Sequence, residues 1–471
     1  MKNSSMQVLP RPSRLQSKTP KSGLTQNNRK QGSSASVAPH ASATITQSAA
    51  VAIGVGAMIG AGIFSILGLI ATMVSDTLPL VFLLGAFICS FSMYSYTKLS
   101  MRFPSVGGPV QFMVQGFGDT VFAGGLNIFQ YLAYVISIAF YANGFAGYAV
   151  SIFENPPSWV YKACALGVVA LFVAVNLLGA HSMGSTEIVI VGIKVAILLA
   201  FGIFGLFFMK SAHWATGFKN FSIVNLLEAT ALISIGFQGF GLVTNAAGHM
   251  RNVKQTLPRV MALVLGITLV IYLLVSITVI GVAPQSMLAH SSSNLLAPVA
   301  ELFMGKFGYY LLIVAALLST SSAVNATLFG SANMAYQIAR DGELPEQLFE
   351  AGASGCGREG IIVTGVLVAA LVLFFDLAPI AMMASAAFLA VYTIVNIAHF
   401  RIRSQTGAKT WILVGGIVVT GAFFVTLFVY MVKTSEPAAW ISFVALAAAS
   451  FILEALYRRF AHRSLAHIEM H

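Results

Sequence analysis

The chain has 471 residues, of which 57% are hydrophobic and only 9% are charged, and its mean hydropathy is +0.84. Soluble domains carry about 25% charged residues, so this composition excludes a water-soluble globular protein and predicts that lipid surrounds most of the chain. The net charge of +11 would suit a nucleic-acid-binding protein, but the distribution of the basic residues gives them another role. Three cysteines without metal or redox spacing predict neither a metal site nor a disulfide framework, and we expect no cofactor.

Residues 1–46 form a polar, basic tail that contains no Asp or Glu and shows no apolar periodicity. We expect this tail to be disordered and cytosolic, where its basic residues can touch anionic lipid. A second, short cytosolic tail is expected at residues 461–471.

Apolar runs of about the 20 residues that a bilayer requires follow the first tail. They predict an all-α integral membrane protein with twelve transmembrane helices. The third and eighth runs exceed a simple span, so we expect them to be tilted or to extend into solvent. The expected spans are 48–73, 78–100, 121–152, 159–179, 185–209, 226–249, 258–283, 296–338, 360–376, 379–400, 411–432 and 438–459.

The positive-inside rule supports this count. With the N-terminus in the cytosol, alternation leaves only five basic residues outside, namely Lys162, Lys210, Lys219, Lys306 and Lys433. Apart from Lys194, which lies inside a span, every other Lys and Arg falls on the cytosolic side. The topology therefore explains the net charge without nucleic acid. We expect a multi-pass protein of the plasma membrane, of the bacterial inner-membrane type, with both termini cytosolic.

The first span contains a cluster of glycines, Gly54, Gly56, Gly60 and Gly62. Each costs about 1 kcal/mol of helix stability relative to Ala, a cost that a helix with no role beyond spanning lipid would avoid. Close helix–helix packing through small residues is one interpretation. The other is a helix broken at mid-membrane, whose freed N–H and C=O groups face a cavity and bind a small polar solute.

The sixth span contains a second cluster, with Gly236, Gly239 and Gly241 around Gln238. Packing glycines would again explain this cluster alone. If the chain consists of two five-helix repeats, however, span one corresponds to span six. Interrupted segments in corresponding positions point to a transporter binding site, so the two clusters together favour two broken helices.

Several separate motifs between residues 45 and 403 are similar to those of a known family. They are Gly56-x-x-x-Gly60-x-Gly62-Ile63-Phe64, Phe103-Pro104-x-x-Gly107-Gly108, Phe237-x-Gly239-Phe240, Asn252 with Leu257-Pro258-Arg259, and Asn325 to Gly330 leading to Ala339-Arg340-Asp341-Gly342-x-Leu344-Pro345. On these motifs the chain resembles amino acid permeases of the amino acid–polyamine–organocation (APC) superfamily.

The resemblance implies a leucine-transporter-like fold, a 5+5 inverted repeat followed by two further helices. The first repeat would cover residues 47–210, the second 211–404, and the two additional helices 405–460. It also implies a secondary active transporter that imports amino acids by alternating access. The sequence departs from the family pattern at His249, Val253 and Asn333, near the inner gate, so the gating contacts of other members are not carried over.

An amino acid zwitterion at mid-membrane requires N–H donors for its carboxylate and acceptors for its ammonium group. A helix that restarts after a break offers unsatisfied N–H groups at its positive end, and the half-helix before it offers free carbonyls. We expect N–H groups from Gly60 to Gly62 and carbonyls of Ile59 and Phe237 to bind the substrate, as the family arrangement also implies. The full expected set is Ile59, Gly60, Ala61, Gly62, Ile63, Gly236, Phe237, Gln238, Gly239 and Phe240.

Lys194 lies near the middle of the fifth span, where a charge costs a few kcal/mol. Snorkelling is the alternative to a function, but both span ends lie far from this residue. Desolvation disfavours the charged form of a lysine, so Lys194 could release and regain a proton. In proton-coupled members of the family a fifth-span lysine occupies the place where sodium-coupled relatives bind a cation, and Lys194 matches that position. Proton symport through Lys194 is therefore the expected mechanism.

Alternatives to proton symport remain open. Ser319, Thr320, Ser321 and Ser322 in the eighth span could supply oxygen ligands for Na⁺. An amino acid or polyamine exchanger and a non-transporting sensor are further alternatives. No His-Glu-x-x-His, Gly-x-Ser-x-Gly or phosphate-loop motif is present, so we do not expect an enzyme. Glu187, near the start of the fifth span, is interpreted as a solvated or packed residue at a span end.

Overall fold

A computed structural model of the chain describes residues 45–74, 77–104, 108–154, 156–178, 183–210, 221–245, 247–250, 252–289, 294–340, 358–434 and 437–460. Residues 1–44 of the expected N-terminal tail and the whole expected C-terminal tail lie outside this description. The motif residues Gly107 and Asp341 to Pro345 and the side chains of Ala61 and His249 lie outside it as well. The helices are α1 (Gln47–Met58), α2 (Ala61–Val74), α3 (Leu78–Arg102), α4 (Pro109–Phe117), α5 (Val121–Val150), α6 (Ser158–Leu177), α7 (Met183–Leu206), α9 (Ile223–Leu232), α10 (Phe240–Asn245), α11 (Val253–Val282), α12 (Gln285–Ala289), α13 (Leu296–Arg340), α14 (Arg358–Phe374), α15 (Leu377–Arg401), α16 (Arg403–Thr406), α17 (Thr410–Thr434) and α18 (Pro437–Phe460).

The described chain is helical throughout, with no β-strand and one isolated bridge between Ile45 and Met250. The predicted all-α membrane fold is therefore confirmed. Within the described ranges, eleven segments are long and apolar enough to cross a bilayer. The ninth expected span corresponds to α14, which has 17 residues. The count of twelve spans and the inverted repeat stay predictions.

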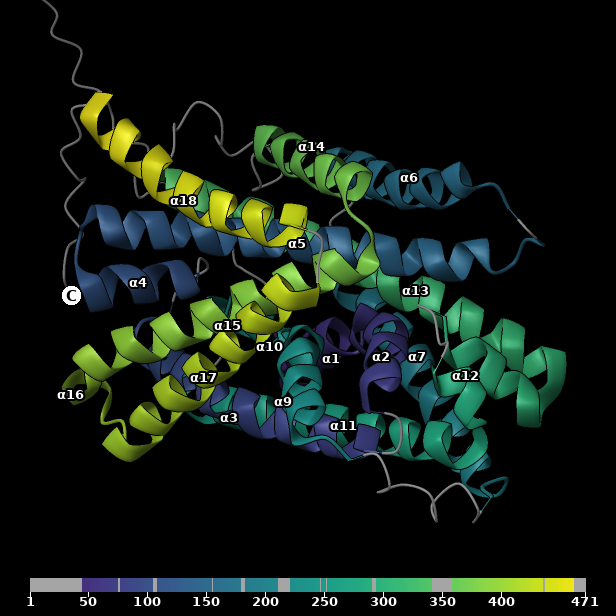
Figure 1. Ribbon diagram of the computed structural model, residues 1–471. Helices are drawn as coiled ribbons and strands as arrows, with labels where there is room; N and C mark the ends of the chain where they lie inside the picture. Colours follow the sequence, from purple (N-terminus) through teal and green to yellow (C-terminus); the bar gives the residue numbers. More distant parts are fainter. Residues whose placement is uncertain are drawn as a thin grey trace, which may run out of the picture. The chain divides into compact units, whose positions relative to one another are not determined.

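Both glycine clusters interrupt a helix, as predicted. The first span consists of α1 and α2, separated at Ile59 and Gly60. The sixth span consists of α9, a tighter 3₁₀ helix at Ile233–Phe237 (η2) and α10, which begins at Phe240. In Figure 1 the purple half-helices α1 and α2 lie near the middle of the bundle, between α5 and α11.

Most span ends lie within a few residues of the expected boundaries, and two spans depart from expectation in a way that has a structural cause. The eighth is not one continuous helix, because Gly305 has φ 62° and ψ −162°, a conformation that glycine adopts without steric cost. A short outer helix therefore precedes the long spanning part of α13. The seventh, α11, begins at Val253 rather than at Pro258, because Asn252 starts it from a left-handed conformation (φ 55°) and the helix tolerates Pro258 in its second turn. The short helices α4, α12 and α16 were not expected.

Helix ends that the sequence assigns to the same side of the membrane lie together. On the predicted outer side, Lys162 near the start of α6 pairs with Asp376 after α14 at 2.9 Å. The Lys210 N–H after α7 donates to the Gly281 carbonyl near the end of α11. On the predicted cytosolic side, Arg458 of α18 pairs with Asp119 before α5. These contacts agree with the alternation of the spans.

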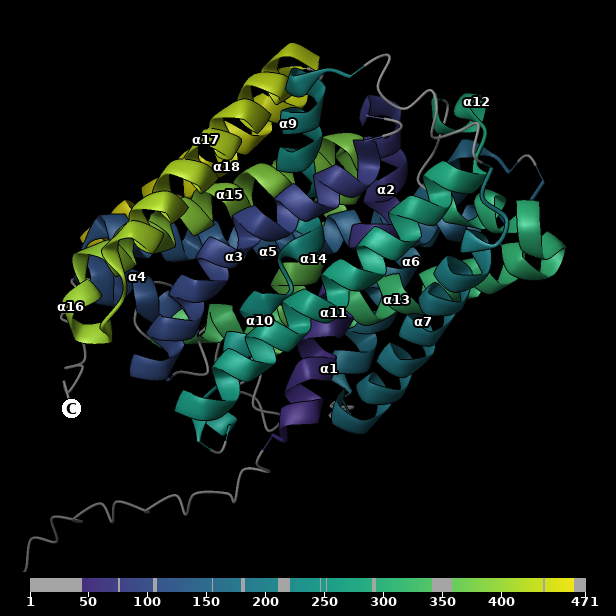
Figure 2. The same ribbon diagram turned by 90° about the horizontal axis from the view of Figure 1, so that it is seen from below.

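Helices that would correspond in two repeats also pack on each other. Helix α3 packs on α11, α5 on α13, and α6 on α14, while α2 contacts η2 and α1 contacts α10. Figures 1 and 2 show α6 beside α14 and α7 beside α13. Except for α7 with α13, these are contacts between helices at corresponding positions of the predicted repeats, and they bring both interrupted helices together.

The outer helices present apolar side chains where a soluble protein would present charge. Phe87 on α3, Val366 on α14 and Trp411 on α17 are 56%, 63% and 68% exposed. By contrast, the two interrupted spans are almost entirely buried. The bundle therefore has an apolar surface suited to lipid and a centre in which polar groups are enclosed by protein.

An ion-pair cluster joins α18 to the start of α5, and it gives a first prediction. Arg458 donates to the fully buried Glu454 at 2.7 Å as well as to Asp119. Arg458→Met should destabilise the detergent-solubilised protein by roughly 1–3 kcal/mol, because a buried carboxylate loses its cation. The measurement is the thermal unfolding midpoint, with exposed Arg459→Met as the matched control. Adding Glu454→Gln should restore part of the loss, and an unchanged midpoint in Arg458→Met would contradict this role.

Candidate binding site at two interrupted helices

The two helix breaks touch each other through glycine backbone. A Cβ placed on Gly62 would lie 2.6 Å from the Cα of Gly236, and one on Gly239 would lie 2.5 Å from the Met58 nitrogen. Only glycine allows backbones to approach this closely. Both interpretations of the glycines therefore apply. The helices are broken, and the small residues also let the broken segments pack closely together.

All the expected binding residues whose burial is described lie in the interior. Ile59, Ile63, Phe237 and Phe240 are fully buried, and Gln238 is 2% exposed. The glycines Gly60, Gly62, Gly236 and Gly239 are buried as well. The structure thus brings the predicted residues of spans one and six together in a closed centre.

The carbonyls freed at the end of α1 are taken up by side chains from three other helices. The Lys194 ammonium group of α7 donates to the Gly56 carbonyl at 2.7 Å. The Tyr272 hydroxyl of α11 donates to the Met58 carbonyl at 2.5 Å, and the Ser319 hydroxyl of α13 donates to the Ile59 carbonyl. An unpaired buried carbonyl costs about 1–3 kcal/mol, so these donors make the break tolerable.

The second break is satisfied in the same way. Tyr272 also lies 2.9 Å from the Gly236 carbonyl, so one hydroxyl joins both breaks. The Cys89 thiol of α3 reaches the Phe237 carbonyl at 3.5 Å, a weak contact. The Ser385 hydroxyl of α15 donates to the Leu232 carbonyl at 2.6 Å. The expected substrate acceptors, the carbonyls of Ile59 and Phe237, therefore each carry a protein donor and keep one further lone pair.

Aromatic and amide side chains surround the second break. Gln238 donates through its Nε2 to the Tyr141 hydroxyl of α5. Among the described residues no hydrogen-bond partner is found for the buried Gln238 Oε1. Phe240 packs on Tyr96 and Tyr392, with ring centroids 5.0 and 5.2 Å away. The Gln238 Oε1 is thus a hydrogen-bond acceptor near a cluster of aromatic rings.

Lys194 lies at the middle of α7 and is fully buried. Its ammonium group does not reach the surface, so snorkelling is excluded in this conformation. Among the described residues no carboxylate lies within 4 Å of its nitrogen, since the ion pairs found there involve Lys162 and Arg458 alone. The Gly56 carbonyl is its close partner, which makes this lysine a direct contact of the first interrupted helix.

Sequence reasoning missed two residues at this centre. Tyr272 is a single hydroxyl-bearing aromatic in the otherwise aliphatic stretch Leu269–Val275, a signal that could have marked it. Glu187 is not only a residue at a span end, because it accepts a hydrogen bond from Ser322 of α13 at 2.6 Å. Its spacing of seven residues from Lys194 places both on one face of α7, and this spacing is visible in the sequence.

The hydroxyl run of the eighth span is divided among several roles. Ser319 reaches the first break, Ser322 reaches Glu187, and Thr320 bonds to the Ala316 carbonyl of its own helix. Within the described ranges no group of three His, Cys, Asp or Glu side chains is placed to hold a metal ion. The run therefore supplies mostly interhelical and local hydrogen bonds in this conformation.

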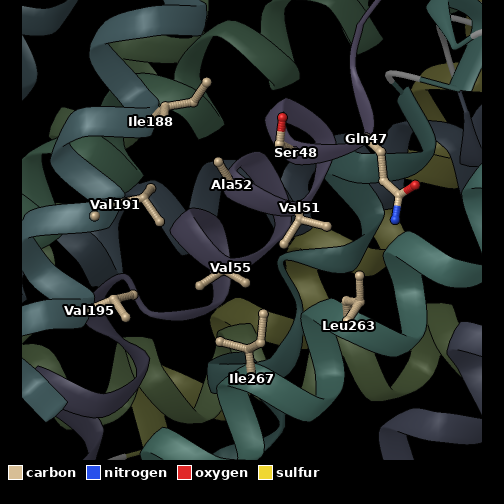
Figure 3. Close-up of a pocket in the computed structure, with 11 residues that line it drawn as sticks. Gln47, Ser48, Val51, Ala52, Val55, Ile188, Val191, Val195, Leu263 and Ile267 are labelled. Carbon is tan, nitrogen blue, oxygen red and sulfur yellow. The ribbon is translucent and has the colours of Figure 1, made fainter.

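A groove of about 690 Å³ lies between α1, α7 and α11, on the flank of the bundle. Figure 3 shows Val51 and Val55 of α1 facing Val191 and Val195 of α7 across it, with Ile267 of α11 below. None of its lining residues belongs to either break. This groove is therefore an apolar surface beside α1 and not the predicted binding site.

Comparison with known proteins agrees with this geometry. Residues 45–452 match the family model described as amino acid permease. An uncharacterized protein of Methanocaldococcus jannaschii is 34% identical over 88% of this chain and 96% of its own length. The inner membrane transport protein YbaT of Escherichia coli is 30% identical over 78% of this chain and 86% of its own. The methylthioribose transporter of Bacillus subtilis is 25% identical over 86% of this chain and 91% of its own length.

Two interrupted helices that meet at the centre of an all-α bundle define the class of a membrane transporter. The chain belongs to the amino acid permease family of the APC superfamily. It is a multi-pass membrane protein of a family of transporters and not of enzymes.

The bridging hydroxyl gives a prediction. Tyr272→Phe should lower the free energy of unfolding by about 1–3 kcal/mol, because the carbonyls of Met58 and Gly236 lose a buried donor. Thermal unfolding in detergent measures the change. Tyr430→Phe is the matched control, since its hydroxyl contacts, outside its own helix and among the described residues, a sulfur 3.9 Å away. Equal midpoints for the two variants would contradict the bridging role.

The contact between the breaks gives another prediction. Gly62→Ala should destabilise the fold, because the new methyl group would meet the Gly236 backbone at 2.6 Å and backbone cannot move aside cheaply. Gly266→Ala on α11 meets nothing within 4 Å, so it should be neutral or stabilise the helix by up to about 1 kcal/mol. The midpoint of thermal unfolding of each variant is the measurement. A midpoint for Gly62→Ala equal to that of wild type would mean that the fold does not require contact between the breaks.

Proposed function

We propose that this protein imports amino acids by proton symport through alternating access. The observation that supports the proposal most directly is the contact between two buried, interrupted helices, with a buried lysine on the carbonyl of Gly56. Membership of the amino acid permease family supports the substrate class.

Substrate would bind between the breaks after they separate. The N–H groups at Gly60, Ala61, Gly62 and Ile63 stand at the start of α2, where no preceding turn supplies carbonyls, and would hold the carboxylate. The carbonyls of Ile59 and Phe237 would accept from the ammonium group, each through its remaining lone pair. The residues Gly236, Gln238, Gly239 and Phe240 would form the side-chain pocket, in which the Gln238 Oε1 is an open acceptor.

Coupling would act through Lys194. A protonated lysine donates to the Gly56 carbonyl and holds α1 against α7. A neutral lysine has a weaker bond, since charge-assisted hydrogen bonds are roughly twice as strong as neutral ones. Proton loss would therefore loosen α1 and favour opening towards the cytosol, where the proposed topology places the start of α1 and both chain termini.

The side chain of the substrate is not determined by family membership. One relative transports methylthioribose according to its name, which is not an amino acid. The buried centre contains no carboxylate among the expected binding residues, which disfavours a cationic side chain. An exchanger is the second candidate, and Na⁺ coupling the third. The Lys194 ammonium group on the Gly56 carbonyl would repel a Na⁺ ion bound at the end of α1, where Ser319 contacts the Ile59 carbonyl.

Uptake into proteoliposomes tests the proposal. A labelled amino acid mixture should accumulate when an inward proton gradient is imposed and should not accumulate without it. Lys194→Met should abolish this accumulation while substrate binding is retained, because the variant cannot carry the proton. Lys433→Met, an exposed lysine at the end of α17, is the matched control. Accumulation independent of the proton gradient would overturn symport in favour of exchange or Na⁺ coupling.

A further inference from the structure

Glu187 and Lys194 lie two helical turns apart on the face of α7 that packs on α1. Val191 lies between them on the same face and is 6% exposed. Lys194 is fully buried, whereas Glu187 lies near the start of α7 and is partly exposed. The carboxylate is thus the member of the pair that water can reach.

Gly56 of α1 contacts both ends of this pair. Its carbonyl accepts from the Lys194 ammonium group at 2.7 Å. A Cβ placed on Gly56 would lie 2.8 Å from the Glu187 Oε1 and 2.6 Å from a methyl group of Val191. Any side chain at this position would therefore push the carboxylate away from α1, so glycine is required for the contact.

The other charged groups on the helices packed against α7 lie towards the ends of those helices. Helix α1 carries none, and α13 carries Glu301 and Lys306 at its outer end and Arg340 at its last residue. Helix α11 carries Lys254 and Arg259 near its start. Helix α11 also carries Tyr272, which is engaged with the two breaks, and α13 carries Tyr309, Tyr310 and Tyr336. Glu187 is the carboxylate that shares a face of α7 with Lys194.

We propose that Glu187 accepts the proton that Lys194 releases and passes it to the cytosol. This proposal rests on the proposed function, proton symport through Lys194. In the step, an N–H bond of the ammonium group breaks and an O–H bond forms on the carboxylate. The proton passes through intervening water, because no described carboxylate lies within 4 Å of the Lys194 nitrogen. Two separated opposite charges become a neutral amine and a neutral carboxylic acid, so no charge is created in the interior. Protonated Glu187 then loses its proton to cytosolic water.

Ser322 fixes the acceptor on this path. Its hydroxyl donates to the Glu187 Oε1 at 2.6 Å and holds the carboxylate between α7 and α13. Ser322 is itself 5% exposed. It acts as a positioning residue, because it orients the carboxylate and does not carry the proton.

Two transport modes in proteoliposomes separate this role from a structural one. Proton-driven accumulation of the labelled amino acid mixture requires net proton movement, whereas exchange of internal for external substrate does not. Glu187→Gln should lower proton-driven accumulation by at least about tenfold and leave exchange at the wild-type rate. Glu187→Asp should recover part of the accumulation, and Ser322→Ala should lower it less than Glu187→Gln. Glu301→Gln, an exposed carboxylate on α13, is the matched control.

The outcomes distinguish the two proposals. If wild type accumulates substrate with the gradient and Glu187→Gln does so equally well, the proton relay from Lys194 to Glu187 is wrong and symport stands. If Glu187→Gln loses exchange and accumulation together, Glu187 is a structural residue and the relay is again wrong. If wild type shows no proton-driven accumulation, symport itself is wrong. The proposed proton transfer from Lys194 to Glu187 is then wrong as well. Infrared difference spectra across a pH titration provide an independent readout, since the carboxylic acid band assigned to Glu187 should be absent in Glu187→Gln.

Discussion

A backbone carbonyl inside a membrane must find a donor, and this constraint governs the centre of the protein. Breaking the first span frees the carbonyls at the end of α1 in a region without bulk water. Lys194, Tyr272 and Ser319 supply donors to the carbonyls of Gly56, Met58 and Ile59. These three side chains come from α7, α11 and α13. The broken helix is therefore held by its neighbours and not by its own hydrogen bonds.

This arrangement makes the position of α1 sensitive to chemistry at its neighbours. Two of the three donors are neutral hydroxyl groups, and one is a cation that can lose its charge. The Tyr272 hydroxyl also contacts the Gly236 carbonyl, so a movement of α1 would change a contact at the second break. In the proposed mechanism, substrate that separates the breaks would replace or weaken these same bonds. A common set of carbonyls would then provide a physical link between substrate occupancy and the state of Lys194.

The sequence was sufficient for the parts of the fold that depend on local pattern. Glycine clusters in the first and sixth spans predicted both breaks, and the charge distribution predicted which helix ends lie together. Pairing across the bundle could not be predicted, because it depends on tertiary contacts that leave no periodic signal. Tyr272 illustrates this limit, since a tyrosine in an apolar span does not reveal that its hydroxyl joins two breaks. Glu187 illustrates a different limit. Its spacing from Lys194 was visible in the sequence, but its contact with Ser322 depends on how α13 packs against α7. The kink at Gly305 was hidden inside one long apolar run.

Movement of α1 upon deprotonation of Lys194 is the central claim, and a distance measurement tests it directly. Spin labels at Gln47→Cys on α1 and Arg403→Cys on α16, two exposed positions, would report the distance by double electron–electron resonance. The background would carry Cys89→Ser, which keeps a donor for the Phe237 carbonyl, with Cys164 and Cys356 replaced by alanine. We predict that the distance distribution shifts across a pH titration in this protein and stays fixed in the Lys194→Met variant. A distribution that does not respond to pH, or one that responds equally in the variant, would contradict the claim.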